Sequence, residues 1–147
     1  MKKLMIGELY KNRLLNTKEE LMNFEEGLNV IVEMLQEEDI PDLCRVFDDN
    51  TKDDEVMFGL IHLIELFSSE KAFVYTVLGI ANMMVTAPNW AKIIIYRCLN
   101  DDFSRSMLKN AITLVEPQVQ QLIISLLNGI KREDSEKFGA DIDKVLY

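Results

Sequence analysis

Residues 56–67 read Val-Met-Phe-Gly-Leu-Ile-His-Leu-Ile-Glu-Leu-Phe, an almost wholly apolar run in which a histidine and a glutamate are the only polar side chains. We expect this run to form a helix near the middle of the fold. Upstream, Asp48-Asp49-Asn50-Thr51 supplies a loop and a helix start. Downstream, Ser68-Ser69 ends the helix, and the acidic residue Glu70 suits the first turn of the next one. The segments on either side of this central helix follow the same pattern.

The rest of the chain also reads as helices separated by short breaks. It contains only three prolines and six glycines, and its apolar side chains recur at intervals of three and four residues. Residues 17–20, Thr-Lys-Glu-Glu, have the form of a capping box, in which the threonine accepts from a free amide and the second glutamate reaches back. The helices expected before and directly after the central one cover residues 2–15, 17–37, 41–47, 70–84 and 88–99. Two more are expected after the breaks at 100–102 and 116–117, with apolar residues over 107–115 and 119–130, and a final piece covers 134–146.

Helical segments of about a dozen residues, joined by short loops, favour antiparallel neighbours. In the second half, alternate helices are spaced by roughly 30 residues, within the range of helical-hairpin repeats, although no sequence signature repeats. We therefore predict an all-α fold in which antiparallel helical hairpins form an irregular, HEAT-like stack. A compact orthogonal helical bundle is the alternative. The length of 147 residues, with 48% hydrophobic and 28% charged residues, predicts one packed domain over residues 1–147.

Negative charge is concentrated in the N-terminal half. Ten carboxylates lie between Glu33 and Glu55, against two basic residues. Residues 1–70 carry 17 Asp/Glu and 7 Lys/Arg, a net charge of −10, whereas residues 71–147 carry 8 and 9, a net charge of +1. Charge of one sign attracts oppositely charged partners at long range. The sequence therefore predicts a basic partner, with these contact candidates: Glu37, Glu38, Asp42, Asp48, Asp49, Asp53 and Asp54.

The same composition argues against several other partners. Nucleic-acid binding depends on basic side chains that displace counterions from phosphates, and here basic residues are outnumbered and form no run longer than a pair. A polybasic membrane patch is missing for the same reason. No apolar run approaches the roughly 20 residues that cross a bilayer. The apolar N-terminal stretch is interrupted by Glu8, Lys11 and Arg13, which argues against export and for a cytoplasmic protein.

No motif in the chain points to catalysis or to a metal or other cofactor. His62 and Glu65 have the i, i+3 spacing of a carboxylate–imidazole site, but the chain has no second histidine, so we expect His62 to be a hydrogen-bonded core residue. An EF-hand starting at Asp48 would need glycine at its sixth position and glutamate at its twelfth, and Asp53 and Gly59 stand there instead. Phosphate-binding glycine loops and nucleophile elbows are missing, so no enzyme is predicted.

Trp90 opens a helix directly after Pro88-Asn89, where its indole would close a helix junction or stay partly exposed for a partner; we favour junction packing. We further expect Trp90 to lie beside an interhelical polar network that sets the register of the helices and comprises His62, Glu65, Arg97 and Asn100. The two cysteines, Cys44 and Cys98, lie within apolar helical patterns, which predicts reduced, buried thiols.

Three segments of the chain resemble a known family. Residues 57–65 (MFGLIHLIE), 89–91 (NWA) and 97–100 (RCLN) are similar to immunity protein family 30 of bacterial polymorphic toxin systems. The resemblance covers about half of the chain, from the central helix onward. It implies a small, all-helical cytoplasmic protein that protects the producing cell from its own contact-delivered toxin.

This resemblance implies a cognate protein toxin as partner, and the acidic N-terminal half suggests that the toxin is basic, because an acidic inhibitor associates rapidly with a basic protein. The alternative to an acidic interface is that these carboxylates only keep the protein soluble. Two other function classes remain: a helical adaptor that binds a peptide in an apolar groove, and a small hydrolase with a pocket of convergent titratable groups. The residues do not specify an oligomeric state.

Overall fold

The computed structural model describes residues 1–147 and contains nine α-helices, one 3₁₀ helix and no strands, so the all-α prediction is confirmed. The elements are α1 (Lys2–Lys11), α2 (Lys18–Ile31), η1 (Glu37–Asp39), α3 (Ile40–Cys44), α4 (Asp54–Ile64), α5 (Glu70–Met83), α6 (Pro88–Cys98), α7 (Asp102–Thr113), α8 (Pro117–Glu133) and α9 (Ser135–Leu146).

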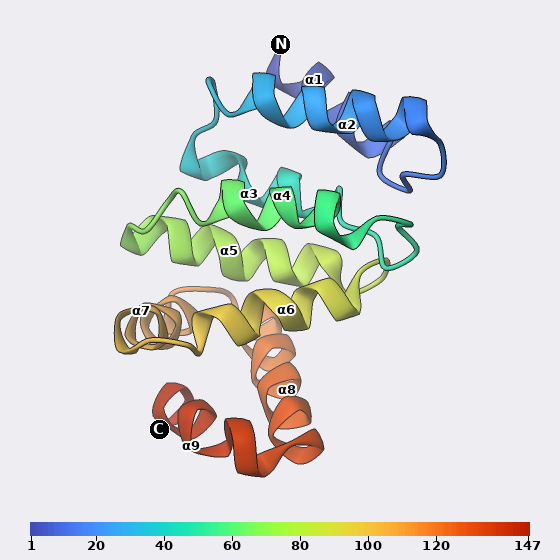
Figure 1. Ribbon diagram of the computed structural model, residues 1–147. Helices are drawn as coiled ribbons and strands as arrows, with labels where there is room; N and C mark the ends of the chain where they lie inside the picture. The colour runs from blue at the N-terminus through green and yellow to red at the C-terminus, as the bar shows by residue number, and fades with distance from the viewer.

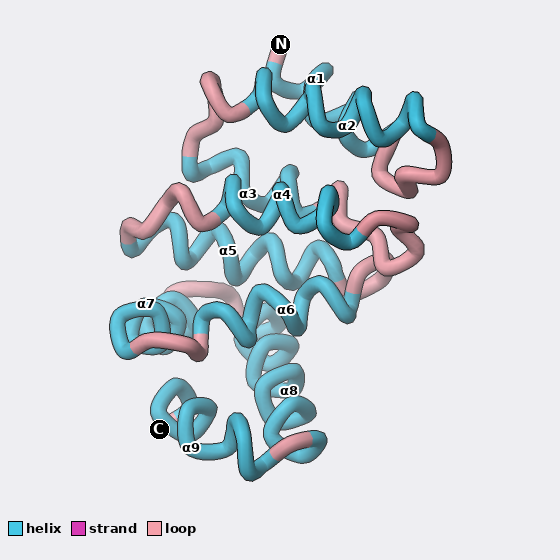
Figure 2. Tube along the Cα trace, in the orientation of Figure 1, coloured by secondary structure: helices cyan, strands magenta, loops and turns pink.

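The helices are arranged as a stack of hairpins. Figure 1 shows α1 to α6 in successive rows from the N-terminus at the top, with α7 seen nearly end-on and α8 running crosswise to the rows. Helix α1 packs on α2, α3 and α7 pack on either side of α5, and α8 packs on α9. The loops between these helices lie along the edges of the stack (Figure 2). The predicted hairpin stack is therefore present, and α7 and α8, which both run across its rows, make it irregular (Figure 1).

Local side chains fix most helix starts. Thr17, Asp53, Ser69, Asp101 and Asp134 each accept a hydrogen bond from a backbone amide in the first turn of the helix that follows. These bonds satisfy amides that have no partner within the helix. Side-chain capping at the predicted breaks is thus the general rule in this chain.

The predicted capping box at Thr17 forms with one change. Thr17 Oγ1 accepts from the Glu20 amide at 3.1 Å, but the Glu20 carboxylate accepts from the Asn16 amide at 2.8 Å rather than from Thr17 itself. The first two helices are also shorter than predicted. Helix α1 ends at Lys11, and a turn over residues 12–14 leads to Leu15, which takes a left-handed conformation with φ of 53°. Helix α2 ends at Ile31, and Gln36 is extended before η1.

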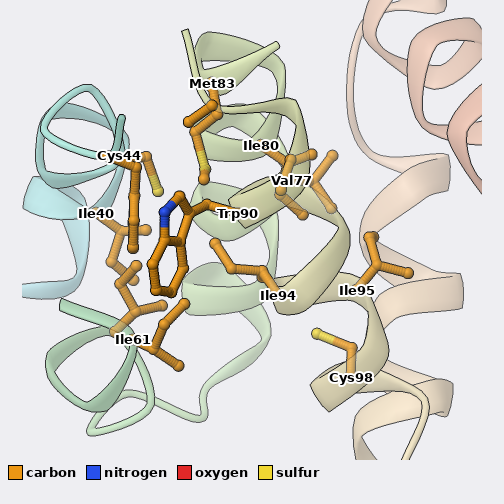
Figure 3. Packing of buried hydrophobic residues seen from close by; sticks show 14 of the residues in the cluster. Ile40, Cys44, Ile61, Val77, Ile80, Met83, Trp90, Ile94, Ile95 and Cys98 are labelled. Carbon is orange, nitrogen blue, oxygen red and sulfur yellow. The ribbon is translucent and has the colours of Figure 1, made fainter. Parts of the chain in front are cut away.

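The core is one continuous cluster of 35 buried hydrophobic residues. Helix α4, predicted to lie centrally, contributes Met57, Leu60, Ile61, Leu63 and Ile64. Figure 3 shows part of this cluster, with the Trp90 indole projecting from α6 toward the side chains of α3 and α4. Because the cluster joins residues from α1 to α9, the crosswise C-terminal helices share one core with the stack.

Helices α3 and α5 approach closely because Gly79 has no side chain. A Cβ at Gly79 would overlap Cys44 Sγ and would lie 3.0 Å from Cys44 Cβ. Cys44 and Cys98 are free and buried, as predicted, and burial raises the pKa of each thiol to about 12. The thiols therefore behave as small apolar side chains at neutral pH.

Candidate partner-binding surface

Asp48, one of the predicted contact residues, is buried with only 5% of its surface exposed. Its carboxylate accepts a hydrogen bond from Arg13 Nε at 3.1 Å and from the Asn50 amide at 2.9 Å. The Arg13 side chain is itself mostly covered. This ion pair joins the end of α1 to the α3–α4 loop, so the charge of Asp48 is balanced inside the protein.

Asp49 is also committed to the fold. Its carboxylate accepts hydrogen bonds from the amides of Asn89 at 2.9 Å and Trp90 at 3.2 Å, at the start of α6. The residue before that helix, Ala87, has no side chain that could do this. The Asp49 amide also donates to Thr86 O at 3.1 Å, in the α5–α6 loop that leads into this helix. Asp49 thus caps a helix that begins about 40 residues later in the chain.

The α3–α4 loop therefore links three hairpins along one edge of the stack. Besides the contacts of Asp48 and Asp49, the Lys52 amide donates to Leu14 O at 2.8 Å. Asp53 caps α4 through the Val56 amide at 3.0 Å. Three of the seven predicted contact residues thus hold the structure together: Asp48, Asp49 and Asp53, all in this loop.

The other four predicted contact residues have fewer internal partners. Glu38 and Asp54 are exposed and make no side-chain hydrogen bond or ion pair, and the exposed Asp42 lies 4.0 Å from Arg45. Glu37, which is half-buried, accepts a hydrogen bond from the Ser69 hydroxyl.

The predicted contact residues also divide into two groups in space. Glu37 lies at the start of α5, where its partner Ser69 caps the helix. Asp49 lies at the other end of α5, where its partner Thr86 follows the last turn. A helix of 14 residues is about 21 Å long, so the two acidic groups lie about 20 Å apart. The negative charge therefore spreads along the stack and forms no single compact patch.

The predicted polar network is brought together in part. Arg97 Nε and Nη2 donate to the two carboxylate oxygens of Glu65 at 2.6 and 2.8 Å, which ties α6 to the end of α4. The hydrogen bonds that Arg97 donates to the Glu65 carboxylate raise the pKa of Arg97, and its guanidinium carbon lies 5.2 Å from the centre of the Phe58 ring.

His62 and Asn100 are exposed and form no side-chain hydrogen bond. The prediction that His62 is a core residue is therefore wrong. On α4 the buried side chains recur at Met57, Leu60, Ile61 and Ile64, so His62 falls on the outer face, where its ring contacts Phe58 edge-on at 5.3 Å.

Trp90 closes the junction, as predicted. It is 4% exposed, and its ring lies 5.6 Å from Phe47 and 5.9 Å from Phe58, centre to centre. Figure 3 shows its indole enclosed by neighbouring apolar side chains. Trp90 is thus part of the core and lines no open groove.

Two hollows open on the surface. The first, with a volume of about 300 Å³, lies where the ends of α4 and α6 meet the starts of α5 and α7. The second is a groove of about 550 Å³ between α1, α3 and the α5–α6 loop, with apolar side chains from Ile6, Tyr10 and Val46. Val85, 93% exposed, and the basic residues Lys3 and Arg45 also line the groove.

Neither hollow was predicted. The first is lined by Phe67, Phe73 and Phe103, and no pattern in the sequence singled out any of them. Their position at the surface depends on which helices cross above them, which periodicity along one helix does not record. No cluster of three or more potential metal ligands is present among residues 1–147, and no helix is both long and apolar enough to cross a membrane.

Comparison with known protein families gives one match. The model of the family described as immunity protein 30 matches residues 11–108, which is two-thirds of the chain. The chain belongs to the immunity protein 30 family. This assignment confirms the resemblance seen in the sequence and gives the protein a cognate toxin as partner. Comparison with curated proteins and with solved structures gave no match.

The family match differs from the resemblance in its extent. It begins at residue 11, at the end of α1, so it includes most of the acidic N-terminal half, which the sequence resemblance had left out. It stops at residue 108, within α7, so α8 and α9 lie outside it. The matched residues therefore cover α2 to α6 and the first half of α7.

Proposed function

We propose that this immunity protein binds a basic cognate toxin domain in the cytoplasm of the producing cell and blocks its active site without catalysing any reaction. Membership of the immunity protein 30 family carries the proposal, because it implies a toxin as partner. The net charge of −10 over residues 1–70 supports a basic surface on that toxin. Glu38, Asp42 and Asp54 are the contact residues best supported, since their side chains are exposed.

The structural carboxylates hold one of these contact residues in position. Asp48, Asp49 and Asp53 hold the α3–α4 loop in place, and so they position Asp54 at the start of α4. A contact residue at the end of a rigid loop loses little conformational freedom when it binds, which favours affinity. The exposed carboxylates thus have the docking role, and the supporting role falls to Asp48, Asp49 and Asp53, which bond within the protein.

The test is the rate of association with the cognate toxin domain, measured by stopped-flow fluorescence at increasing salt concentration. Steering by exposed charge predicts a rate that falls steeply as salt rises. The double variant Glu38→Gln/Asp54→Asn should associate roughly threefold more slowly at low salt. The matched control, Glu116→Gln/Glu136→Gln, removes two exposed charges from the C-terminal half and should change the rate less.

An association rate that does not depend on salt, or an equal effect of the two double variants, would show that the acidic surface does not guide binding. Failure of the protein to bind the toxin domain at all, or to protect cells that express it, would overturn the proposed function itself.

One observation favours a second candidate function. The groove of about 550 Å³ beside α1 has apolar walls and is lined by Lys3, Arg45 and Asp42, a net positive charge of one, which suits an adaptor that binds a short peptide with an acidic end. Replacement of Tyr10 with alanine should then abolish binding of such a peptide while leaving protection against the toxin unchanged.

A further inference from the structure

The hollow at the ends of α4 and α6, called here the aromatic pocket, has walls formed by Phe67, Phe73 and Phe103. The rings of Phe73 and Phe103 meet edge-to-face, with centres 6.2 Å apart and planes at 78°. Phe103 is 56% exposed, so this wall borders on solvent. A volume of about 300 Å³ lies at the lower limit for ligand-binding clefts, which suits one large side chain.

Two carboxylates also line the aromatic pocket. Asp101 accepts from the Ser104 amide at 2.7 Å and from the Ser104 hydroxyl at 3.2 Å, one hydrogen bond to each oxygen. Glu65 likewise accepts one bond on each oxygen, both from Arg97. A carboxylate has about four acceptor positions, so both groups retain capacity for further donors.

The balance of charge in the aromatic pocket is negative. Arg97 and Glu65 neutralise each other, which leaves the charge of Asp101. The pKa of the Cys98 thiol, in the pocket wall, is affected by the same negative charges. Burial is the main cause of its raised pKa, and the negative charges of Glu65 and Asp101 raise the pKa further against the opposing effect of Arg97. A cationic group entering the pocket would therefore be attracted.

We propose that the aromatic pocket receives an arginine side chain of the cognate toxin; this inference rests on the proposed function and names one contact within it. A guanidinium can stack on the faces of aromatic rings while its N–H groups donate to carboxylates. The protein already shows this arrangement next to the pocket, where Arg97 lies over Phe58 and pairs with both oxygens of Glu65. Lysine is less suited, because its ammonium group is more strongly hydrated and cannot stack.

The experiment titrates the ¹⁵N-labelled protein with acetyl-arginine amide and follows the backbone amide signals of residues 101–104 by NMR. Acetyl-citrulline amide, which has nearly the same shape without the charge, and acetyl-phenylalanine amide serve as comparison probes. The arginine probe should give saturating shifts at these residues, and the citrulline probe should bind at least threefold more weakly.

Two variants have matched controls in the same chain. Asp101→Asn keeps the helix cap but removes the charge, and Asp134→Asn makes the same change at the cap of α9. Phe103→Ala removes a wall of the pocket, and Leu114→Ala truncates a side chain of equal exposure, 55%, at the other end of α7. Each pocket variant should weaken binding of the arginine probe about threefold, and each control should leave it unchanged.

Equal binding of the arginine and citrulline probes, stronger binding of the phenylalanine probe, or equal effects of pocket variants and controls would overturn the inference. The toxin domain separates this inference from the proposed function. If the wild-type protein binds the toxin and the two pocket variants bind it equally well, the pocket assignment is wrong and the proposed function stands. If both pocket variants weaken toxin binding and both controls do not, the pocket assignment is supported.

Discussion

Replacement of Asp49 with alanine should destabilise this protein although the residue lies in an acidic surface loop. The carboxylate accepts two amide hydrogen bonds at the start of α6, and Ala87, the residue before that helix, cannot replace them. Loss of a helix cap costs about 0.5–2 kcal/mol, and a hydrogen bond to a charged group contributes about 1.5–3 kcal/mol. Because water can reach part of this helix end, we expect the free energy of unfolding to fall by about 2 kcal/mol.

The assay is urea unfolding followed by the fluorescence of Trp90, the only tryptophan, which lies beside the lost hydrogen bonds. A loss of about 2 kcal/mol corresponds to a fall in Tm of about 4–8 °C for a chain of this size. Asp49→Asn should have an intermediate effect, because the amide oxygen can still accept one of the two bonds.

The matched control is Asp54→Ala. Asp54 has no side-chain partner and stabilises α4 only through its place in the first turn, so its loss should cost less than about 1 kcal/mol. If Asp49→Ala costs no more than Asp54→Ala, the carboxylate of Asp49 does not cap α6, and the structural role given to the acidic loop is wrong.

Three further predictions concern the core and the α4–α6 ion pair. Gly79→Ala should lower the free energy of unfolding in urea by about 1–3 kcal/mol, because the new methyl group overlaps Cys44. The double variant Gly79→Ala/Cys44→Ala should recover most of that loss. The control Gly129→Ala, at an open position, should be neutral or stabilising. Arg97→Ala should lower the free energy of unfolding by about 1 kcal/mol through loss of a half-exposed ion pair and a ring contact, and an unchanged Tm would contradict the proposed register role. Burial raises the pKa of the Cys44 and Cys98 thiols to about 12, above the value of about 9 expected in the unfolded chain. The free energy of unfolding should therefore decline as the pH rises from about 9 to 12. A Cys44→Ala/Cys98→Ala variant should lose less of its free energy of unfolding between pH 8 and pH 10.

The positions of the helices could be predicted because their signals are local. Ser69 and Asp101 cap helices that begin directly after them, and the apolar spacing of α4 identified its buried face. The errors at the ends of α1 and α2 have a different origin. The left-handed turn falls on the buried Leu15, a residue type that rarely takes positive φ, and not on its neighbour Asn16 or on Asn12, the C-cap of α1.

The binding residues were harder to predict, because exposure is not a local property. Asp48 and Asp54 are the same residue type in one acidic stretch, yet Arg13 covers the first and nothing covers the second. His62 stands among apolar residues and was predicted to be buried, but the helix turns it outward.

Sequence alone determined that this protein is helical, where most helices begin, and that its N-terminal half is strongly acidic. These properties follow from side chains three or four residues apart and from composition. Tertiary structure decided which carboxylates are free to meet a toxin and where an aromatic pocket opens. The cap of α6 joins residues 49 and 90, and the ion pair beside the pocket joins residues 65 and 97. Such contacts exist only after the hairpins have stacked, since packing, and not spacing along the chain, brings these groups together.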